Sequence, residues 1–274
     1  MRFTKGHGTE NDFVVLPDPD GVLDLTPSRV AALCDRRRGL GADGVLRVVR
    51  WKSLQGVGAP EPGIDWFMDY RNSDGSIAEM CGNGVRVFAR YLAAAGLVEP
   101  GSFAIGTRAG VRTVAFVEDE IAAGMGPVTV GGAATATIGG RSFPGVAVDV
   151  GNPHLVCVTA EPIADLDLTR PPGHDPGLFP HGVNVEFVTP LADGAIALRV
   201  HERGVGETRS CGTGVVAAVA ASLHLAGRDR GTVAVTTPGG RLRVDIGDAG
   251  AVLRGPAVLV AEGELSEQWW RAHA

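Results

Sequence analysis

Short valine-rich runs separated by glycines make up most of the hydrophobic pattern of this chain. The runs at residues 64–70 and 196–200 are typical, and each predicts a strand. Two longer stretches rich in Ala, Val and Leu predict buried helices, one directly after Cys81 and one directly after Cys211. Because strands outnumber helices and most connections resemble hairpins, we expect an α+β protein.

Three connecting segments are also recognisable in the pattern. Thr26 and Pro27 have the properties of an N-cap and a first-turn residue, and they predict a helix that extends through Cys34. Residues 51–63 contain several glycines and prolines, and they predict a loop. Residues 128–142 contain two Gly-Gly pairs, and we expect this segment to hold the crossover between two halves of the chain.

The sequence repeats itself over a long interval. Residues 80–84 read MCGNG and residues 210–214 read SCGTG. A threonine follows each of these two cysteines by 26 residues, and a Gly-Pro pair occurs at residues 126–127 and again at 255–256. A period this long indicates two similar domains rather than a solenoid, whose units are shorter.

We therefore expect two homologous domains related by pseudo-twofold symmetry. Each domain would be a mostly antiparallel, barrel-like sheet wrapped around a central helix, with the active site in the cleft between the domains. The first domain would comprise residues 1–124 and 258–274 and carry Cys81. The second would comprise residues 125–257 and carry Cys211.

Composition and charge narrow the classes of function. The chain has 274 residues, of which 45% are hydrophobic and 20% charged, as in ordinary folded proteins. Its net charge of −6 gives no electrostatic reason to bind nucleic acid or an anionic membrane. The sequence contains neither an apolar signal region nor the roughly 18 consecutive apolar residues of a membrane helix, so we expect a cytoplasmic protein. The four cysteines lack zinc-like spacing, and we expect free thiols and no metal site.

Two of the cysteines are candidates for chemistry. Cys34 and Cys157 lie in apolar runs, where a thiol is usually a small buried hydrophobe. Cys81 and Cys211 instead stand where a glycine-containing loop becomes a helix. The helix dipole and free N–H groups there can lower a thiol pKa from about 8.5 toward neutrality and can bind a carboxylate. Facing thiols would suit acid–base chemistry on the two faces of one carbon, and a redox switch that closes to a disulfide is the alternative.

Polar residues precede both of these cysteines. Asn72 and Glu202 each lie nine residues before their cysteine. A single Asn in a turn usually makes a local backbone hydrogen bond, and an isolated Glu-Arg pair is usually a surface ion pair. Taken alone, these residues therefore do not identify a site.

Five motifs together resemble those of the diaminopimelate epimerase family. They are KGHGTENDF at residues 5–13, MCGNGVR at 80–86, GNPH at 151–154, GVN at 182–184 and HERGVGETRSCGTG at 201–214. The resemblance spans essentially the whole chain. It implies a cofactor-independent amino-acid epimerase that interconverts LL- and meso-diaminopimelate, in the supply of lysine and peptidoglycan precursors.

The resemblance also implies a role for each matching residue. Cys81 and Cys211 would be the two catalytic thiols, and His154 and Glu202 would help to set their protonation. The remaining positions would bind the substrate, with Asn11, Asn72, Asn152, Asn184, Glu202 and Arg203 at its distal end and Gly82, Asn83, Gly212 and Thr213 at the reacting carboxylate. A small-molecule substrate and a homodimer are implied, with no cofactor, metal, nucleic acid or membrane.

One position departs from the family pattern, and two other functions stay open. Many family members carry a substrate-contacting Gln directly after the residue that corresponds to Asp43, whereas this chain has Gly44, which we leave out of the site. Proline-racemase-type enzymes are the closest enzymatic alternative, although their second cysteine typically follows an Asp-Arg-Ser-Pro run that this sequence lacks. A non-catalytic amino-acid-binding or thiol-redox module on the same scaffold is the other.

Overall fold

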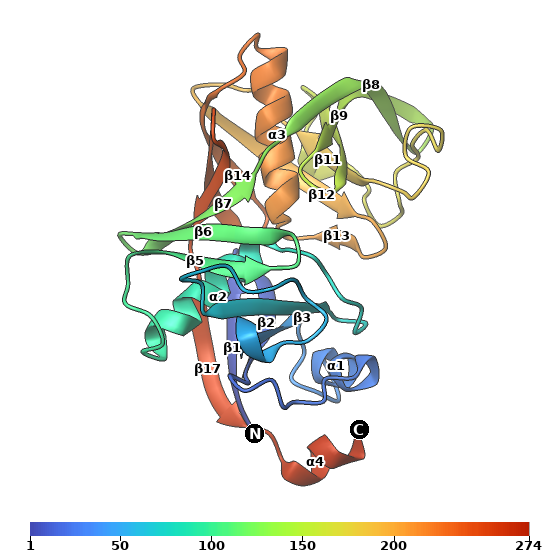
Figure 1. Cartoon of the computed structure of the whole chain (residues 1–274). Helices are drawn as coiled ribbons and strands as arrows, with labels where there is room; N and C mark the ends of the chain where they lie inside the picture. Colours follow the sequence, from blue (N-terminus) through green and yellow to red (C-terminus); the bar gives the residue numbers. More distant parts are fainter. Residues whose placement is uncertain (274) are drawn as a thin grey trace. The chain divides into compact units, whose positions relative to one another are not determined.

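The computed structural model describes residues 1–273 and divides into two compact units. Unit 1 consists of Met1–Ala123 and Pro256–Ala274, and unit 2 consists of Gly124–Gly255. Each unit contains a sheet and a long helix that contacts many of its strands (Figure 1). Within the described residues, no helix is both long and apolar enough to cross a membrane.

In unit 1 the strands pair side by side in the order β17–β1–β2–β3–β4–β5–β6–β7. Neighbouring strands are antiparallel except for the pairs β2–β3 and β4–β5, which are parallel. The strands are β1 (Arg2–Gly8), β2 (Asn11–Pro17), β3 (Gly44–Arg50), β4 (Trp66–Asn72), β5 (Ser102–Thr107), β6 (Gly110–Val117), β7 (Glu120–Gly126) and β17 (Val258–Glu264). The last three residues of β7 already belong to unit 2. The C-terminal strand β17 thus extends the sheet at β1.

Unit 2 repeats this order with the same strand directions. Its strands pair as β8–β9–β10–β11–β12–β14–β15–β16, and the parallel pairs are again the third and the fifth, β10–β11 and β12–β14. The strands are β8 (Thr129–Ile138), β9 (Arg141–Asp149), β10 (Pro153–Val158), β11 (Asn184–Val188), β12 (Ala195–Glu202), β14 (Gly231–Thr237), β15 (Gly240–Gly247) and β16 (Gly250–Gly255). A short strand, β13 (Gly206–Thr208), also pairs with β12. The predicted α+β class is confirmed, and the duplication extends to the topology of the sheets.

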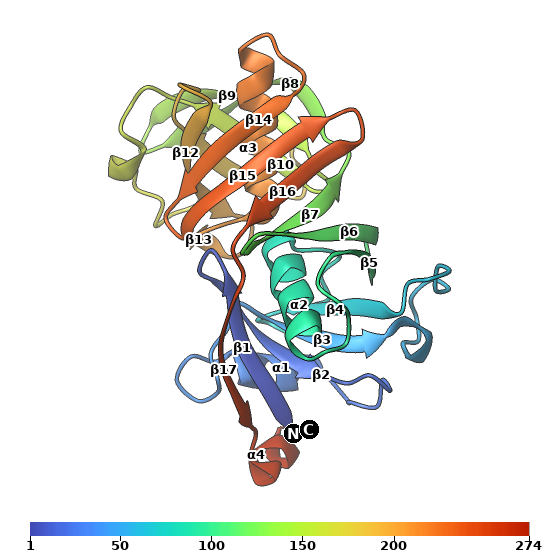
Figure 2. The ribbon, with the colours of Figure 1, turned by 90° about the vertical axis from the view of Figure 1, so that its left-hand side faces the viewer.

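The long helix of each unit is packed against strands on several sides. In unit 1, α2 (Gly82–Ala94) contacts β1, β2, β3, β4, β6 and β17, and its Phe88 and Leu92 are fully buried. In unit 2, α3 (Gly212–Leu225) contacts β8, β9, β10, β11, β12, β14, β15 and β16. Figure 2 shows this helix behind β14, β15 and β16. Full burial of one Phe or Leu side chain stabilises a fold by about 1.5–3 kcal/mol. The apolar stretches after the two cysteines therefore form the centres of the two units, as the sequence predicts.

The short helices lie at the edges of the units. The helix α1 (Pro27–Cys34) begins at its N-cap Thr26, whose hydroxyl accepts a hydrogen bond from the Arg29 N–H at 3.2 Å. This start confirms the prediction from the Thr-Pro pair. The others are α4 (Glu267–Ala272) and two single turns of 3₁₀ helix, η1 (Trp51–Ser53) and η2 (Ile163–Asp165).

One segment differs from its predicted structure. Residues 128–142 were expected to be a crossover, but β8 and β9 pair here as a long antiparallel hairpin. Gly139 and Gly140, with φ of +55° and +79°, form its turn. Residues 131–132 lie where the register of the pairing shifts, and this irregularity accommodates the other Gly-Gly pair within a strand. Glycine pairs therefore marked a turn and a bulge rather than a linker.

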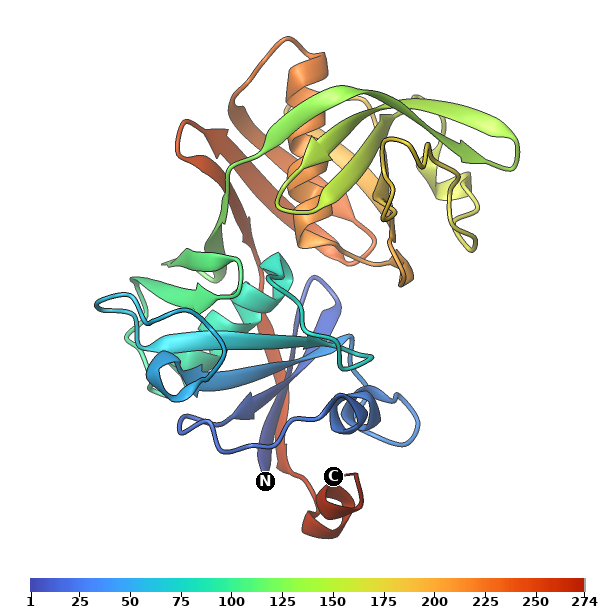
Figure 3. The same ribbon diagram turned by 45° about the vertical axis from the view of Figure 1, so that its right-hand side comes forward.

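The long loop between β10 and β11, residues 159–183, packs against the β8–β9 hairpin. Figure 3 shows this loop beside the hairpin, and the Thr137 N–H donates to the Gly173 carbonyl at 2.9 Å. Leu166, Leu168 and Phe179 from the loop are buried in the same apolar cluster as the hairpin. The loop is therefore part of the core of unit 2.

Candidate active site

Cys81 is the N-cap residue of α2. The backbone N–H of Gly84 donates to its Sγ at 3.4 Å, and the side chain is partly exposed. The same Sγ lies 3.6 Å from Asn11 Oδ1, so the thiol can donate its proton to that amide oxygen. The helix N-terminus favours the thiolate and the amide oxygen favours the thiol, so the surroundings of Cys81 suit both protonation states.

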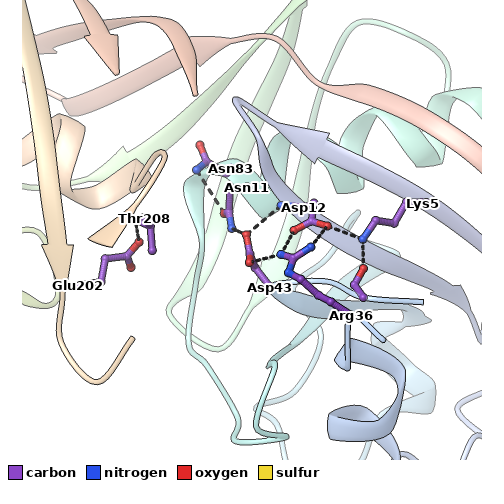
Figure 4. Close-up of polar contacts among 9 residues, drawn as sticks. Lys5, Asn11, Asp12, Arg36, Asp43, Asn83, Glu202 and Thr208 are labelled. Carbon is purple, nitrogen blue, oxygen red and sulfur yellow. Dashed lines mark hydrogen bonds and ion pairs between the residues drawn. The ribbon is translucent and has the colours of Figure 1, made fainter. Parts of the chain in front are cut away.

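The orientation of the Asn11 amide is set by a carboxylate. Asn11 Nδ2 donates to Asp43 Oδ2 at 2.8 Å (Figure 4). Because a carboxylate can only accept hydrogen bonds, the amide nitrogen of Asn11 must face Asp43 and its oxygen must face the other way. That oxygen accepts from Asn83 Nδ2 at 3.3 Å and lies beside Cys81. Asp43 therefore orients Asn11 so that the amide oxygen of Asn11 can accept the proton of the Cys81 thiol.

A charged network lies behind Asn11. Arg36 donates to Asp12 Oδ1 at 2.7 Å and to Asp43 Oδ1 at 2.8 Å, as Figure 4 shows. Lys5 Nζ donates to the other carboxylate oxygen of Asp12 at 2.5 Å. Burial alone would raise the pKa of Asp12, but hydrogen bonds and charge interactions with Arg36 and Lys5 outweigh it and lower the pKa to about 2. Asp12 is therefore ionised at neutral pH and ties β1 and β2 to the segment that carries Asp43.

The other unit 1 residues expected to bind substrate differ in their surroundings. Asn72 ends β4 in an exposed turn, where its Nδ2 donates to Ser76 Oγ at 2.9 Å. Asn83 is fully buried, and its Oδ1 accepts from Arg86 Nη2 at 2.8 Å. The Asn83 side chain thus helps to hold Arg86, whose pKa is lowered by burial to about 10. A role for Gly82 and Asn83 in binding a carboxylate would therefore use their backbone N–H groups.

The space beside Gly44 is already filled. A Cβ at Gly44 would lie 2.7 Å from Tyr70 Cε2 and 2.5 Å from the Arg71 carbonyl oxygen. Both distances are too short for packed atoms, so the ring of Tyr70 occupies the room that a longer side chain at position 44 would need. This packing accounts for the departure from the family pattern at Gly44.

Cys211 is the N-cap residue of α3, the counterpart of Cys81. Gly214 N–H donates to its Sγ at 3.4 Å, and Thr213 Oγ1 lies 3.5 Å from the sulfur. Burial raises the pKa of Cys211 well above its ordinary value, and the negative charges of Glu202 and Glu186 raise it further. The predicted lowering of the thiol pKa is wrong for Cys211, because these effects outweigh the hydrogen bonds from Thr213 and the helix N-terminus.

Glu202 is the last residue of β12 and lies next to Cys211. The hydroxyl of Thr208, on the paired strand β13, donates to Glu202 Oε1 (Figure 4). Burial raises the pKa of Glu202, and hydrogen bonds from Thr208 and Cys211 oppose this rise. A carboxyl group and a thiol with raised pKa values are thus in contact, so a proton can pass between them.

The ends of β10, β11 and β12 bring the remaining unit 2 residues together. His154 and Asn184 are partners in the parallel register of β10 and β11. His154 is fully buried, with Nε2 3.0 Å from Asn152 Oδ1. Asn184 Oδ1 accepts from the Arg203 N–H at 2.9 Å, and Asn184 Nδ2 donates to the Pro153 carbonyl at 3.4 Å. The Asn184 side chain therefore ties the three strand ends together.

No role was assigned from the sequence to two buried charged residues, one in each unit. Glu186 is fully buried on β11, with Oε1 2.7 Å from His154 Nδ1. Arg86 is fully buried on α2 and donates to Asn83. The available signal in both cases was a charged residue within an apolar stretch, since buried charges are rare unless they are paired. Residues 184–188 read NVEFV, in which the glutamate is the charged exception.

The starts of the two long helices offer sites for an anion. Gly82 and Gly212 occupy the first position of α2 and α3, where backbone N–H groups have no partner within the helix. Such N–H groups, together with the helix dipole, bind carboxylates and phosphates. Among residues 1–273, no group of three or more His, Cys, Asp and Glu side chains is arranged to hold a metal ion.

Comparison with known proteins identifies the family. The sequence matches the diaminopimelate epimerase family over residues 3–131 and 146–260. It is 58% identical, over 287 residues, to the diaminopimelate epimerase of Rhodococcus erythropolis, and this match covers 99% of this chain and 98% of the relative. This chain belongs to the diaminopimelate epimerase family. Another relative, the diaminopimelate epimerase of Mycolicibacterium smegmatis, is 57% identical over 290 residues and 100% of both chains. The resemblance inferred from the five motifs is thereby confirmed.

Solved structures show the same fold at low sequence identity. A probable proline racemase from Agrobacterium radiobacter aligns with a TM-score of 0.70 and 15% identity, over 97% of this chain and 93% of that one. A PhzF-family phenazine biosynthesis protein from Bacillus anthracis aligns with a TM-score of 0.71 and 16% identity, over 97% and 99%. At these identities the likeness concerns the fold alone. The diaminopimelate epimerase family therefore shares its architecture with proteins of other names.

Proposed function

We propose that this enzyme converts LL-diaminopimelate to meso-diaminopimelate with two cysteines and no cofactor. The observation that carries the proposal is the matched pair of N-cap thiols. Cys81 and Cys211 each begin the long helix of their unit, and each accepts a 3.4 Å hydrogen bond from the glycine N–H three residues later. The identity of the substrate is inferred from the family to which the chain belongs.

Inversion at a carbon requires a base on one face and an acid on the other. In the proposed reaction the thiolate of one cysteine takes the α-proton of the substrate and becomes a thiol. The thiol of the other cysteine gives its proton to the opposite face and becomes a thiolate. In the reverse direction the two cysteines exchange roles. After each forward conversion the first cysteine holds the abstracted proton and the second is a thiolate, so one proton leaves the first cysteine to solvent and one returns from solvent to the second before the next turnover. This mechanism requires Cys81 and Cys211 to reach opposite faces of the same α-carbon.

The helix starts would stabilise the charge that develops during the reaction. An α-proton beside a carboxylate is a weak acid, and its removal places negative charge on the carboxylate. The N–H groups of Gly82 and Asn83 in unit 1, and of Gly212 and Thr213 in unit 2, suit that carboxylate because they begin α2 and α3. Preorganised donors of this kind are often the largest single contribution to catalysis.

The two thiols have different neighbours, which suggests different resting states. Cys211 has a raised pKa and a carboxylate, Glu202, in contact with it, so we assign it the protonated form. Glu202 then serves as the group that exchanges a proton with Cys211. Cys81 lies beside a neutral amide oxygen, which can accept the proton of the thiol, and beside a helix N–H, which donates to the sulfur and suits the thiolate. His154 acts from a distance, through the hydrogen bond to Asn152.

The amide-rich remainder of the site suits the second amino-acid group of diaminopimelate. Carboxylate and ammonium groups are recognised by amides, guanidinium and carboxylate side chains in combination. The residues assigned to this end are Asn11, Asn72, Asn152, Asn184, Glu202 and Arg203. Proline lacks such a distal group, so an enzyme built with these residues should favour diaminopimelate.

Turnover by cysteine variants tests the proposal. The purified enzyme is incubated with LL-diaminopimelate, and the meso isomer is measured by chiral chromatography. Cys81→Ala and Cys211→Ala should each abolish conversion. Cys34→Ala is the matched control, because Cys34 is buried in the core of unit 1 and should retain near-normal turnover. Near-normal turnover in Cys81→Ala or Cys211→Ala contradicts the two-thiol mechanism.

Substrate trials separate the alternative functions. Racemisation of proline in place of diaminopimelate would indicate a proline-racemase-type enzyme. Binding of diaminopimelate without exchange of its α-proton would indicate a non-catalytic module. We also propose a cytoplasmic homodimer, on family resemblance alone. Sedimentation of the purified protein at the mass of a single chain contradicts the dimer.

A further inference from the structure

Glu186 is a buried carboxylate for which the mechanism above has no use. It lies in the middle of β11 between apolar neighbours and is fully buried. Its Oε1 is 2.7 Å from His154 Nδ1, whereas its Oε2 is buried without a hydrogen-bond partner. Burial of an ionised carboxylate is unfavourable unless a positive charge compensates it. His154 is the residue placed to supply that charge.

Glu186 is packed directly beneath the cysteine turn of unit 2. A Cβ at Gly214 would lie 2.6 Å from Glu186 Oε1, so a glycine at that position leaves room for the carboxylate. The titratable groups that interact with Glu186 are His154 and Cys157 on β10, Glu202 on β12 and Cys211 at the start of α3. Of these groups only His154 can carry a positive charge.

A chain of hydrogen bonds leads from this carboxylate to the thiol. His154 Nε2 is 3.0 Å from Asn152 Oδ1, and Asn152 Nδ2 is 3.3 Å from Thr213 Oγ1. Thr213 Oγ1 in turn is 3.5 Å from Cys211 Sγ. Each ring nitrogen of His154 therefore faces an oxygen acceptor. A histidine can donate from both nitrogens only as the imidazolium ion.

We propose that Glu186 is a positioning residue, which holds His154 as the imidazolium ion and thereby turns the amide nitrogen of Asn152 toward Thr213. The carboxylate can only accept, so it fixes the proton on Nδ1 and supplies the counter-charge. The imidazolium then donates from Nε2 to the Asn152 oxygen. The proposal rests on the proposed function in so far as Asn152 and Cys211 act on the substrate.

The substitution Glu186→Gln separates charge from shape. The glutamine oxygen can still accept from His154 Nδ1, so the ring keeps its place without its counter-charge. The neutral ring then has an acceptor at Nε2, which favours the reversed amide of Asn152. Thr213 would then face the amide oxygen of Asn152 instead of its nitrogen, so its hydroxyl would donate to that oxygen and be withdrawn from Cys211 and from the substrate. We expect KM for diaminopimelate to rise and kcat/KM to fall roughly 10- to 100-fold, the effect of one lost hydrogen bond to a charged group.

Nitrogen NMR of the imidazole rings measures the proposed state without any turnover. In protein labelled with ¹⁵N-histidine, the His154 signals are assigned by their loss in His154→Gln. At neutral pH both nitrogens of His154 should be protonated in the wild type, and Nε2 should lose its proton in Glu186→Gln. Glu161→Gln is the control, because Glu161 is exposed and changes the net charge equally.

The outcomes are distinct. A neutral His154 in the wild type overturns the proposal, even when Glu186→Gln fails to fold. Unchanged His154 signals or unchanged KM in a folded Glu186→Gln also overturn it. A wild type that does not convert diaminopimelate contradicts the proposed function, but it leaves the NMR test of Glu186 intact.

Discussion

Gly214→Ala should damage the enzyme, whereas the equivalent change Gly84→Ala should not. The two glycines occupy the same place in the repeat, three residues after Cys211 and Cys81. A Cβ at Gly214 would lie 2.6 Å from the Glu186 carboxylate oxygen. A Cβ at Gly84 would meet its nearest atom, Leu46 Cδ2, at 3.3 Å, so the end of that flexible side chain has to move by only about 0.1 Å to reach an ordinary contact of 3.4 Å. The same added methyl group therefore meets a buried carboxylate at one position of the repeat and a flexible side chain at the other.

The magnitude follows from the displacement that the methyl group forces. Glu186 Oε1 must withdraw by about 0.8 Å to reach an ordinary contact of 3.4 Å, and its 2.7 Å hydrogen bond to His154 would break. Overpacking costs about 1–3 kcal/mol and a lost hydrogen bond to a charged group about 1.5–3 kcal/mol, while Ala gains up to about 1 kcal/mol over Gly in a helix. We expect the free energy of unfolding of Gly214→Ala to be about 2 kcal/mol or more below that of the wild type.

Urea unfolding and steady-state kinetics measure both effects. Gly84→Ala should have a free energy of unfolding between that of the wild type and about 1 kcal/mol above it, because only the helix gain applies. Gly214→Ala should unfold at lower urea and show a lower kcat/KM for diaminopimelate. Equal stability of Gly214→Ala and the wild type would refute this reasoning, as would greater damage from Gly84→Ala.

Three further changes have expected outcomes. The pKa of Asp12 is lowered to about 2 from 3.8, so its ionised form stabilises the fold above pH 4. As pH falls from about 4 to 2, the free energy of unfolding of the wild type should fall by about 2 kcal/mol more than that of Asp12→Asn, as urea titrations at each pH would measure. Asp43→Asn frees the amide of Asn11 to turn, so KM should rise while thermal unfolding barely moves; an unchanged KM contradicts the assigned orientation. Iodoacetamide should modify Cys81 before Cys211, which is buried with a raised pKa, and peptide mass spectrometry would reveal the opposite order.

Much of the fold followed from patterns that are local in the sequence. The two helices after the cysteines and the strand at 196–200 were predicted because burial and hydrophobic pattern coincide there. The hairpin of residues 128–142 was not, because glycine permits a bulge or a turn as readily as a linker. The pairing between β17 and β1 joins the two ends of the chain. The repeat led us to expect residues 258–274 in the first domain, but no local pattern indicates which strand they pair with.

In the candidate site, too, the positions of residues could be predicted from motifs, whereas their protonation could not. The motifs placed Cys81 and Cys211 at helix starts, and the structure has them there. The direction of the Cys211 pKa shift was predicted wrongly, because the pKa depends on burial and on the negative charges of Glu202 and Glu186, of which only Glu202 lies in one of the five motifs. Residue type and spacing therefore located the thiols, but their protonation depends on three-dimensional neighbours.

The fate of solvent deuterium tests the two-thiol reaction most directly. The enzyme is incubated with LL-diaminopimelate in deuterated water, and both isomers are recovered after a small fraction has reacted. Because one thiol removes the α-proton and the other supplies a solvent-derived one, the meso product should carry deuterium at its inverted carbon. The recovered LL substrate should keep its proton. A single catalytic base would return the original proton to the product or deuterate the recovered substrate, and either result contradicts the account.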